Sequence, residues 1–291
     1  MAFSMNPSGR DQIGTYIRQS RFTEEELVLL QQEEQMMTAV LGGVLPEQPD
    51  PTSFESVLDV GCGTGQWLIE VAQTYPGIAY LVGVDISKQI VEYAQAQATS
   101  QQVADRVQFR VMDALSFLDF PPDTFNLINI RFGASFLRTW DWDRLLHDFK
   151  RIARSNGVIR IVEANWMESN NPAQEQQANL LLQAFYRSGH AFTLQKDGMT
   201  SGLVPLLRQS GFQNIQTADR ILHYHKETLQ GQFFLTYIKQ IFQSIQPFEQ
   251  KWNRHSSKEI VYKRMQEDMQ QPGFEMSWKF LTLWAKNPPK E

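Results

Sequence analysis

Between residues 56 and 166, apolar segments of strand length alternate with amphipathic segments of helix length, which constrains the fold more than any other feature. We expect strands at residues 56–60, 79–85, 107–113, 125–131 and 157–166, and helices at 66–75, 87–100 and 142–154. Repeated units of this length predict a parallel sheet with helices on both faces and right-handed crossovers. The chain of 291 residues can therefore hold one large α/β domain.

The flanking segments are expected to be mostly helical. A helix is predicted over residues 23–42, where Thr23 and Glu26 have the spacing of a capping box. After residue 166 we expect helices and strands at the following positions: helices at 171–189, 202–212, 227–245 and 257–270, and strands at 214–225 and 277–286.

The proline-rich segment 45–53 is predicted to be a linker. Residues 1–50 would then form a helical N-terminal extension or lid, followed by one domain at 51–291. Within that domain, cap segments are expected near 167–205 and 226–272.

Composition excludes several classes of partner. The net charge is -5 and no long basic run occurs, which argues against binding to nucleic acid or to an anionic membrane surface. The single cysteine, Cys62, cannot form an intramolecular disulfide or a cysteine-rich zinc site, and no metal site is expected. Neither a signal peptide nor a membrane-spanning segment is recognisable, so we expect a cytoplasmic protein, either a monomer or a homodimer.

The segment "VLDVGCGTGQW", residues 57–67, places three glycines at alternate positions between an expected strand and an expected helix. Glycine permits the sharp turn, and the helix N-terminus offers amides to a nucleotide-like cofactor. The dinucleotide fingerprint requires a third glycine or alanine where this chain has Gln66, after Gly61 and Gly63. The misfit disfavours a nicotinamide oxidoreductase, which stays an alternative.

Two acidic residues follow the next two strands. Asp85 lies 20 positions after Gly65, where a carboxylate can accept hydrogen bonds from both hydroxyls of a ribose. Asp113 ends the third strand, where a carboxylate can accept from an exocyclic amine such as that of adenine. Because ligands of open parallel sheets bind outside the carboxyl ends of the strands, both carboxylates are expected to face one ligand. Nucleotides and S-adenosylmethionine share the ribose feature.

The segments "VLDVGCGTG", "GVDIS", "MDA" and "FNLINIRFGASFL" together resemble the class I S-adenosylmethionine-dependent methyltransferases, in motif order, over residues 55–166. "LRQSGFQNIQ" and "FLTLWAK" add a weaker similarity. The resemblance implies a Rossmann-like, doubly wound α/β sheet of seven strands with the last strand antiparallel. It also implies S-adenosyl-L-methionine as cofactor and S-adenosyl-L-homocysteine as product.

The resemblance further implies roles for individual residues. The glycine loop would pack along the methionine part of the cofactor, Asp85 would bind the ribose, and Asp113 the adenine amine. Asp59 would help to anchor the ammonium end, Ile86 would lie beside the adenine ring, and Arg131 would approach the methionine end. The residues expected to bind the cofactor are Asp59, Gly61, Gly63, Asp85, Ile86, Asp113, Ala114, Arg131 and Tyr16.

Tyr16 is a lid candidate because the N-terminal stretch resembles the extension of small-molecule and LaeA-like methyltransferases. The chain departs from the family pattern at Asn126, where aspartate is common. It also departs in the roughly 50 residues before the closing strand, where the family has a short hairpin. This insertion is expected to cap the substrate site.

A sulfonium methyl group is already reactive, so such an enzyme mainly supplies proximity and alignment, and no fixed catalytic motif is expected. A base helps when the acceptor must lose a proton early. Candidates are Glu163 at the end of the fifth strand, His190 in a cap loop, and His223, which shares a strand face with His225. The aromatic residues that could line a substrate pocket are Trp166, Phe185, Tyr186 and Phe192.

We therefore expect an S-adenosylmethionine-dependent methyltransferase acting on a small-molecule acceptor by direct in-line displacement. The alternative is a non-methylating protein on the same scaffold, either a cyclase-like catalyst or a regulatory protein. The sequence leaves the acceptor and its reacting atom open.

Overall fold

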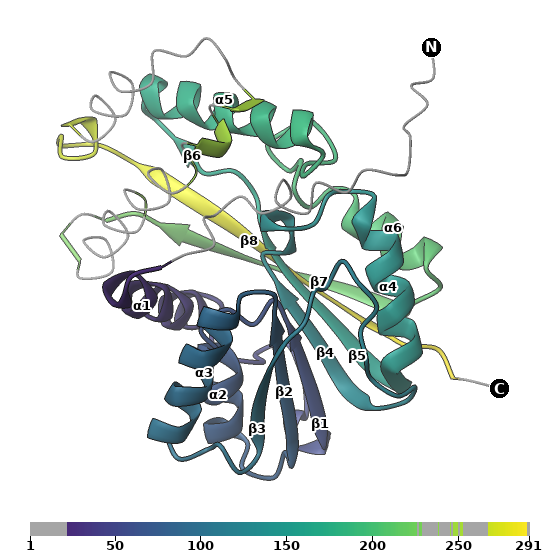
Figure 1. Cartoon of the computed structure of the whole chain (residues 1–291). Coiled ribbons are helices and arrows are strands. Elements are labelled where there is room, and N and C mark those ends of the chain that lie inside the picture. Colours follow the sequence, from purple (N-terminus) through teal and green to yellow (C-terminus); the bar gives the residue numbers. More distant parts are fainter. Residues whose placement is uncertain are drawn as a thin grey trace.

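One sheet of eight strands organises the described part of the chain in a computed structural model (Figure 1). The described residues are 22–225, 227–228, 238, 245, 247–249, 251–252 and 267–289. The strands are β1 (Ser56–Val60), β2 (Tyr80–Asp85), β3 (Val107–Val111), β4 (Phe125–Arg131), β5 (Ala153–Ala164), β6 (Glu168–Ser169), β7 (Gln213–His223) and β8 (Met276–Lys286). Their order is β3-β2-β1-β4-β5-β8, and β6 and β7 each pair with β8.

The five strands β1 to β5 are parallel to one another, and β8 is antiparallel to both β5 and β7. The predicted Rossmann-like sheet of seven strands, with the last one antiparallel, is confirmed. The additional strand β6 is two residues long and pairs with the start of β8. All five residues of β1 are buried, as expected for a central strand of a parallel sheet.

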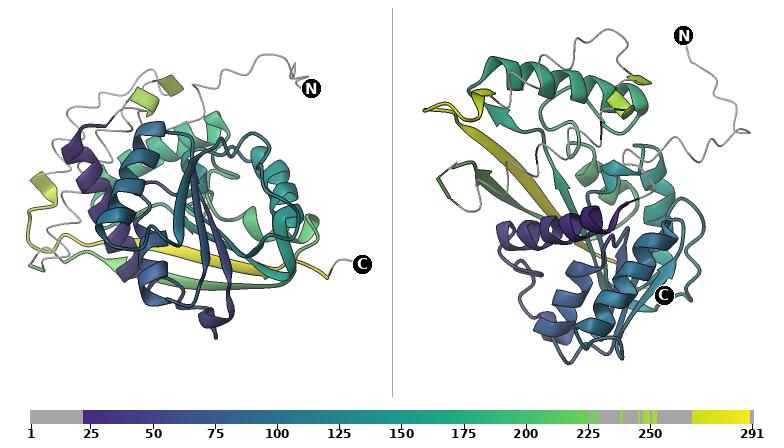
Figure 2. Two further views of the ribbon diagram at one scale, coloured as in Figure 1. Left: turned by 60° about the horizontal axis from the view of Figure 1, so that its bottom comes forward. Right: turned by 60° about the vertical axis from the view of Figure 1, so that its left-hand side comes forward.

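Helices cover both faces of the sheet (Figures 1 and 2). They are α1 (Glu24–Val40), α2 (Gln66–Thr74), α3 (Lys88–Ser100), α4 (Asp141–Ile152), α5 (Pro172–Ser188) and α6 (Leu203–Gln209), with 3-10 turns η2 (Pro51–Ser53) and η3 (Gly133–Ser135). The predicted capping box of α1 is present between Thr23 and Glu26. The helices predicted at 227–245 and 257–270 lie mostly outside the described residues.

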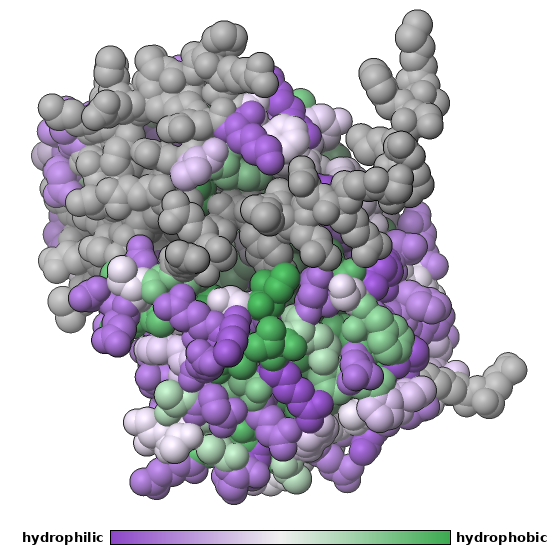
Figure 3. Space-filling view, in the orientation of Figure 1, coloured by the Kyte–Doolittle hydropathy of each residue, from purple (hydrophilic) through white to green (hydrophobic). Residues whose placement is uncertain are grey.

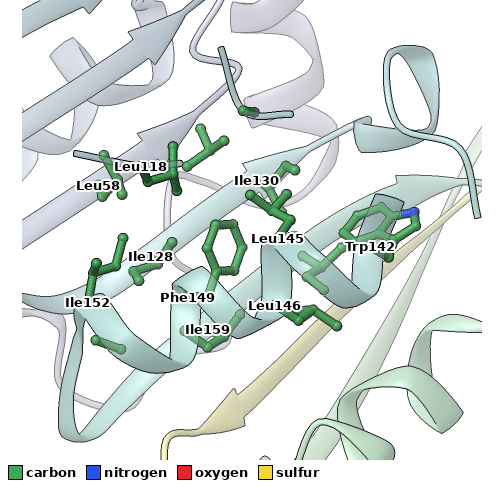
Figure 4. Close-up of a cluster of buried hydrophobic side chains, with 14 of the residues drawn as sticks. Leu58, Leu118, Ile128, Ile130, Trp142, Leu145, Leu146, Phe149, Ile152 and Ile159 are labelled. Atoms are coloured by element: carbon green, nitrogen blue, oxygen red, sulfur yellow. The ribbon is translucent and has the colours of Figure 1, made fainter. Parts of the chain in front are cut away.

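The two faces separate because successive strand residues point in opposite directions. On one face, Val57 and Leu127 pack with α2 and α3. On the other face, strand residues meet one side of α4, whose Leu145, Phe149 and Ile152 recur at helical spacing. Figure 4 shows this second cluster, with labelled residues Leu58, Leu118, Ile128, Ile130, Trp142, Leu145, Leu146, Phe149, Ile152 and Ile159. Each such buried side chain contributes about 1.5–3 kcal/mol of transfer free energy.

The segment between α1 and β1, which contains the predicted linker at 45–53, packs on the domain at its start. Val44 and Leu45 are buried against residues of α2. The indole nitrogen of Trp67 donates a hydrogen bond to the carbonyl of Val44 at 3.0 Å. Helix α1 ends at Val40, before Gly42 and Gly43, whose φ values are positive. The two buried residues that follow, Val44 and Leu45, join α1 to the domain by a packed contact.

The ring of Phe109 leaves no room for a side chain at Gly83 inside β2. A Cβ at Gly83 would lie 2.5 Å from Cδ1 of Phe109 and 3.0 Å from Cβ of Cys62. A Cβ at Gly65 would overlap the same ring. The aromatic side chain therefore fills the space that both glycines leave open.

We predict that Gly83→Ala lowers the free energy of unfolding by about 1–3 kcal/mol, because the added methyl group forces the Phe109 ring to shift. The measurement is urea denaturation. Gly77→Ala is the matched control, because a Cβ there meets no atom within 4 Å, and it should change the free energy by less than about 0.5 kcal/mol. Equal effects of the two substitutions would contradict the packing explanation.

Candidate functional site

The glycine loop connects β1 to α2 and is held against β2. The amides of Gly61 and Cys62 both donate to the carbonyl of Val84, at 2.8 and 3.0 Å. Gly61, Gly63 and Gly65 have φ values of +70°, +55° and +75°, a region that favours glycine. The backbone conformation alone therefore accounts for a glycine at each of the three positions.

The three glycines face different groups. A Cβ at Gly61 would lie 2.8 Å from the ring of Phe136, and Gly65 faces the Phe109 ring. Gly63 instead faces a polar group, because a Cβ there would lie 2.5 Å from Oε1 of Glu34 in α1. Of the three, Gly63 is thus the glycine whose open side faces a charged group of the site.

Asp85 and Asp113 lie at the same edge of the sheet, as the strand pattern predicts. Asp85 accepts from the amide of Ser87 at 2.9 Å and from the amide of Gly63 at 3.3 Å. Burial raises its pKa, against the lowering effect of these amides. Asp113 accepts from the amide of Leu115 at 2.8 Å and is partly exposed. Asp113 is thereby oriented by the backbone of its own loop, and Asp85 by its own loop and the glycine loop together.

Apolar surface adjoins these carboxylates. Ile86, directly after β2, is 39% exposed, and Val111, the last residue of β3, is 53% exposed. Ala114 is buried, and its carbonyl accepts from Nη2 of Arg144 at 2.9 Å. Figure 3 shows an apolar patch near the middle of the face seen in Figure 1, with polar side chains around it. Exposed apolar side chains next to hydrogen-bond acceptors suit a planar base with an amino group.

Asp59 is anchored by a chain of buried side chains. Asn129 of β4 donates to Oδ1 of Asp59 at 2.7 Å, and Nη1 of Arg160 in β5 donates to Oδ1 of Asn129 at 2.8 Å. Nε of Arg160 donates in turn to Oε1 of Glu47 at 2.8 Å. Burial raises the pKa of Asp59 to about 6, although Arg131, the Asn129 hydrogen bond and Arg160 act to lower it. The sequence analysis missed this chain, for which a charged residue in the apolar strand "GVIRIV" was the available signal.

Glu34 and Arg131 meet beside the glycine loop. The amide of Thr64 donates to Oε1 of Glu34 at 3.0 Å, and Nη2 of Arg131 lies 3.7 Å from Oε2. Nη1 of Arg131 also donates to the hydroxyl of Thr38 at 3.3 Å. Burial raises the pKa of Glu34 to about 7, while Arg131 and Thr64 act to lower it. The sequence analysis did not single out Glu34, although it lies seven residues after the buried Leu27 on the same side of the predicted helix.

The three base candidates lie in different environments. Glu163 is buried at the end of β5 and accepts from the amides of Ala134 and Ala164, at 2.9 and 3.1 Å. Burial raises its pKa to about 7, against the effect of these two amides. His190 is also buried, and burial lowers its pKa to about 3, with a further lowering by Arg138. His223 is exposed at the end of β7, the strand that pairs with β8.

The aromatic pocket candidates separate into two groups. Trp166 and Phe185 pack edge to face, with ring centroids 5.1 Å apart, and Phe185 contacts Phe248 at 5.3 Å. Tyr186 is 46% exposed, and Phe192 packs instead against Gly202 near the α4 side of the core. Only Trp166 and Phe185 of the four therefore share one aromatic cluster.

Three further predictions concern the lid candidate Tyr16, metal sites and membrane-spanning helices. Tyr16, the lid candidate, lies outside the described residues. Among the described residues, no group of three or more His, Cys, Asp or Glu side chains could hold a metal ion. Within the same residues, no helix has the length and apolar character needed to cross a membrane.

Comparison with known proteins agrees with the resemblance seen in the sequence. Residues 57–157 match the family model described as a methyltransferase domain. A demethylmenaquinone methyltransferase of Lactiplantibacillus plantarum is 43% identical over 77 residues, which are 26% of this chain and 32% of the relative. The aligned regions span between about a third and about half of the first curated relatives, from 32% to 46% of their lengths.

Two solved structures share the fold over most of the chain. Geranyl diphosphate methyltransferase in complex with S-adenosylmethionine has a TM-score of 0.53 at 14% identity, covering 91% of both chains. The [4+2]-cyclase SpnF has a TM-score of 0.51 at 18% identity, covering 92% of this chain and 98% of its own. At this level of identity the likeness establishes the architecture of the chain.

We predict that Arg160→Met lowers the free energy of unfolding by about 3–5 kcal/mol, because it leaves the Glu47 carboxylate buried without its cation. The side chains of Arg160 and Glu47 are 0% and 5% exposed. The double variant Glu47→Gln with Arg160→Met should recover much of that loss, and urea denaturation of the double-mutant cycle measures the coupling. Strictly additive losses would rule out a coupled pair.

We also predict that Glu163 makes the protein less stable as the pH rises. Its folded pKa of about 7 lies above its ordinary value of 4.5, so the folded state binds its proton more tightly than the unfolded state. The resulting stability is lost between these two values, at a cost of about 2 kcal/mol from pH 5.5 to 8.0. Thermal unfolding should therefore depend less on pH in Glu163→Gln than in the parent, and an equal pH dependence would contradict this assignment.

Proposed function

We propose that this chain, which carries a methyltransferase domain over residues 57–157, transfers a methyl group from S-adenosylmethionine to a small-molecule acceptor. The observation that carries the proposal is the position of Asp85. Its carboxylate lies at the carboxyl end of β2 and accepts from the amide of Gly63. A ribose-binding carboxylate and the glycine loop are thus held together at the edge where open parallel sheets bind their ligands.

The residues of this edge fit the proposed cofactor. The carboxylate of Asp85 accepts two backbone hydrogen bonds, which leaves acceptor capacity for the two hydroxyls of a ribose. The open side of Gly63 faces the carboxylate of Glu34, which occupies the position that a Cβ would take. The apolar side chain of Ile86 and the partly exposed carboxylate of Asp113 match the ring and the amine of adenine.

In this proposal each residue binds a particular part of the cofactor. Asp85 binds the ribose, Asp113 the adenine amine, and Ile86 covers the adenine ring. Asp59 and Arg131 lie at the amino-acid end, near the carboxyl ends of the neighbouring strands β1 and β4. The bound cofactor supplies a methyl group on a positively charged sulfur, and the protein contributes alignment and exclusion of water.

A base is needed only for acceptors that must lose a proton, and among the three candidates we favour Glu163. A general base works best when its pKa lies near the working pH, and the pKa of Glu163 is about 7. The pKa of His190 is about 3, so its imidazole is too weak a base to hold a proton at neutral pH. His223 lies on an exposed strand edge.

The acceptor is proposed to be a small molecule with an apolar part. Trp166 and Phe185, in the segment after β5, belong to a cluster that also includes residues of α1 and β8. The net charge of -5 is unsuited to nucleic acid. The single cysteine, which is buried, suits a cytoplasmic location, and both a monomer and a homodimer are compatible with the proposal.

A non-methylating role on the same scaffold, cyclase-like or regulatory, is the alternative. SpnF, named as a [4+2]-cyclase, shares the fold. The two functions differ in one observable: a methyltransferase converts S-adenosylmethionine to S-adenosylhomocysteine when an acceptor is present. A protein that binds both compounds but shows no conversion with any acceptor from a broad panel would support the alternative.

We predict that S-adenosylmethionine and S-adenosylhomocysteine raise the thermal unfolding temperature of the parent and that Asp85→Ala largely removes this shift. Loss of hydrogen bonds to a charged acceptor should weaken binding by about 10- to 100-fold. Asp105→Ala is the control, because its side chain is 75% exposed, and it should keep the full shift. Absence of any shift in the parent with both compounds would refute the proposed function.

A further inference from the structure

One face of α1 is joined to the glycine loop and its neighbours by three polar side chains spaced three or four residues apart. Gln31 donates to Oε1 of Gln66 at 2.7 Å, at the start of α2. Glu34 accepts from the amide of Thr64, and Thr38 accepts from Arg131. The N-terminal helix therefore contributes side chains to the site, packs against α2 and contacts Arg131 at the end of β4.

The carboxylate of Glu34 has unused hydrogen-bonding capacity at the loop. Oε1 lies against the open side of Gly63, and Oε2 is shielded from solvent. Oε2 has no hydrogen-bond partner within 3.5 Å among the described residues, since Arg131 at 3.7 Å forms an ion pair longer than a hydrogen bond. The Thr64 hydroxyl, which is also buried, acts on the same carboxyl group and lowers its pKa. A shielded carboxylate oxygen without a donor is unfavourable, so this position is suited to a ligand that brings N–H groups.

The charges around the loop are also unbalanced. Burial raises the pKa of the Cys62 thiol, and the carboxylates of Asp85, Asp59 and Glu34 raise it further. Arg131 lies among them, whereas the other nearby guanidinium, Arg160, is paired with Glu47. When all three carboxylates are ionised, the cluster lacks positive charge. A cationic group of a ligand would supply it.

We propose that Glu34 is a binding residue for the α-ammonium group at the amino-acid end of the cofactor, so that the N-terminal helix selects ligands that carry this group. The inference rests on the proposed function. Asp59 approaches the same end from β1, and Glu34 adds a second carboxylate from outside the matched domain. A ligand with the adenosine part alone would satisfy Asp85 and Asp113 but would bring no donor to Oε2 of Glu34.

The test compares two ligands by isothermal titration calorimetry. S-adenosylhomocysteine carries the amino-acid end, and 5′-methylthioadenosine lacks it but keeps the adenosine and the sulfur. Glutamine has nearly the same shape as glutamate without the charge, so Glu34→Gln should weaken the binding of S-adenosylhomocysteine by about tenfold or more. Binding of 5′-methylthioadenosine should change by less than about twofold. Glu25→Gln, exposed in the first turn of the same helix, should leave both affinities unchanged.

The pH dependence of binding provides a second readout. The free pKa of Glu34 is about 7 and an ammonium group would lower it, so S-adenosylhomocysteine should bind more weakly to the parent as the pH falls from 8 to 6. Glu34→Gln should reduce this dependence, and Asp59, with a pKa of about 6, should retain part of it. Among the described residues, the ionisable groups that interact with Glu34 are Asp59, Arg131, Cys62 and Tyr93, and those that interact with its partner Arg131 include Asp59, Glu70 and Arg160.

The outcomes separate the possible explanations. If Glu34→Gln weakened the binding of both ligands equally, the role of Glu34 would be structural and the inference would be overturned. Tighter binding of S-adenosylhomocysteine would overturn it too, because Glu34 would then compete with the ligand's carboxylate for Thr64 and Arg131. Glu34→Asp keeps the charge on a shorter side chain, so its affinity for S-adenosylhomocysteine should lie between those of the parent and Glu34→Gln. Failure of the parent to bind either ligand would instead refute the proposed function, and the inference with it.

Discussion

The buried chain of hydrogen bonds from Asp59 through Asn129 and Arg160 to Glu47 links the centre of the sheet to the segment before β1. Arg160 is fully buried in β5, and a guanidinium in that position requires a partner of opposite charge. Glu47 supplies it from the packed segment that follows α1. The hydrogen bonds of the buried Arg160 therefore orient Asp59, through Asn129, at one end of this chain. At the other end they help to hold α1 where Glu34 reaches the glycine loop.

Features that depend on neighbouring residues could be predicted from the sequence. The order of strands and helices over residues 56–166 and the capping box at Thr23 are local patterns, and the structure has both. Asp85 and Asp113 lie on different strands, but parallel strands end at the same edge, so their proximity follows from topology. The match of residues 57–157 to a methyltransferase domain agrees with the same motifs.

Features that depend on distant pairs could not be predicted. Glu47 and Arg160 are 113 positions apart, and Glu34 and Thr64 are 30 apart, so no local pattern pairs them. The prolines of segment 45–53 are visible in the sequence, whereas the packing of Leu45, at its start, with residues of α2 is not. The glycine loop shows the same limit, since Gly63 faces Glu34 of a helix that the loop motif does not include.

The central claim is that the carboxylates around the glycine loop bind S-adenosylmethionine and that the N-terminal helix completes this site. A crystal structure of the full chain with S-adenosylhomocysteine tests it most directly. The account predicts the ribose hydroxyls at Asp85, the adenine amine at Asp113 and the α-ammonium group within hydrogen-bond distance of Glu34. A ligand bound away from the glycine loop, or an amino-acid end with α1 displaced and Glu34 in solvent, would contradict it.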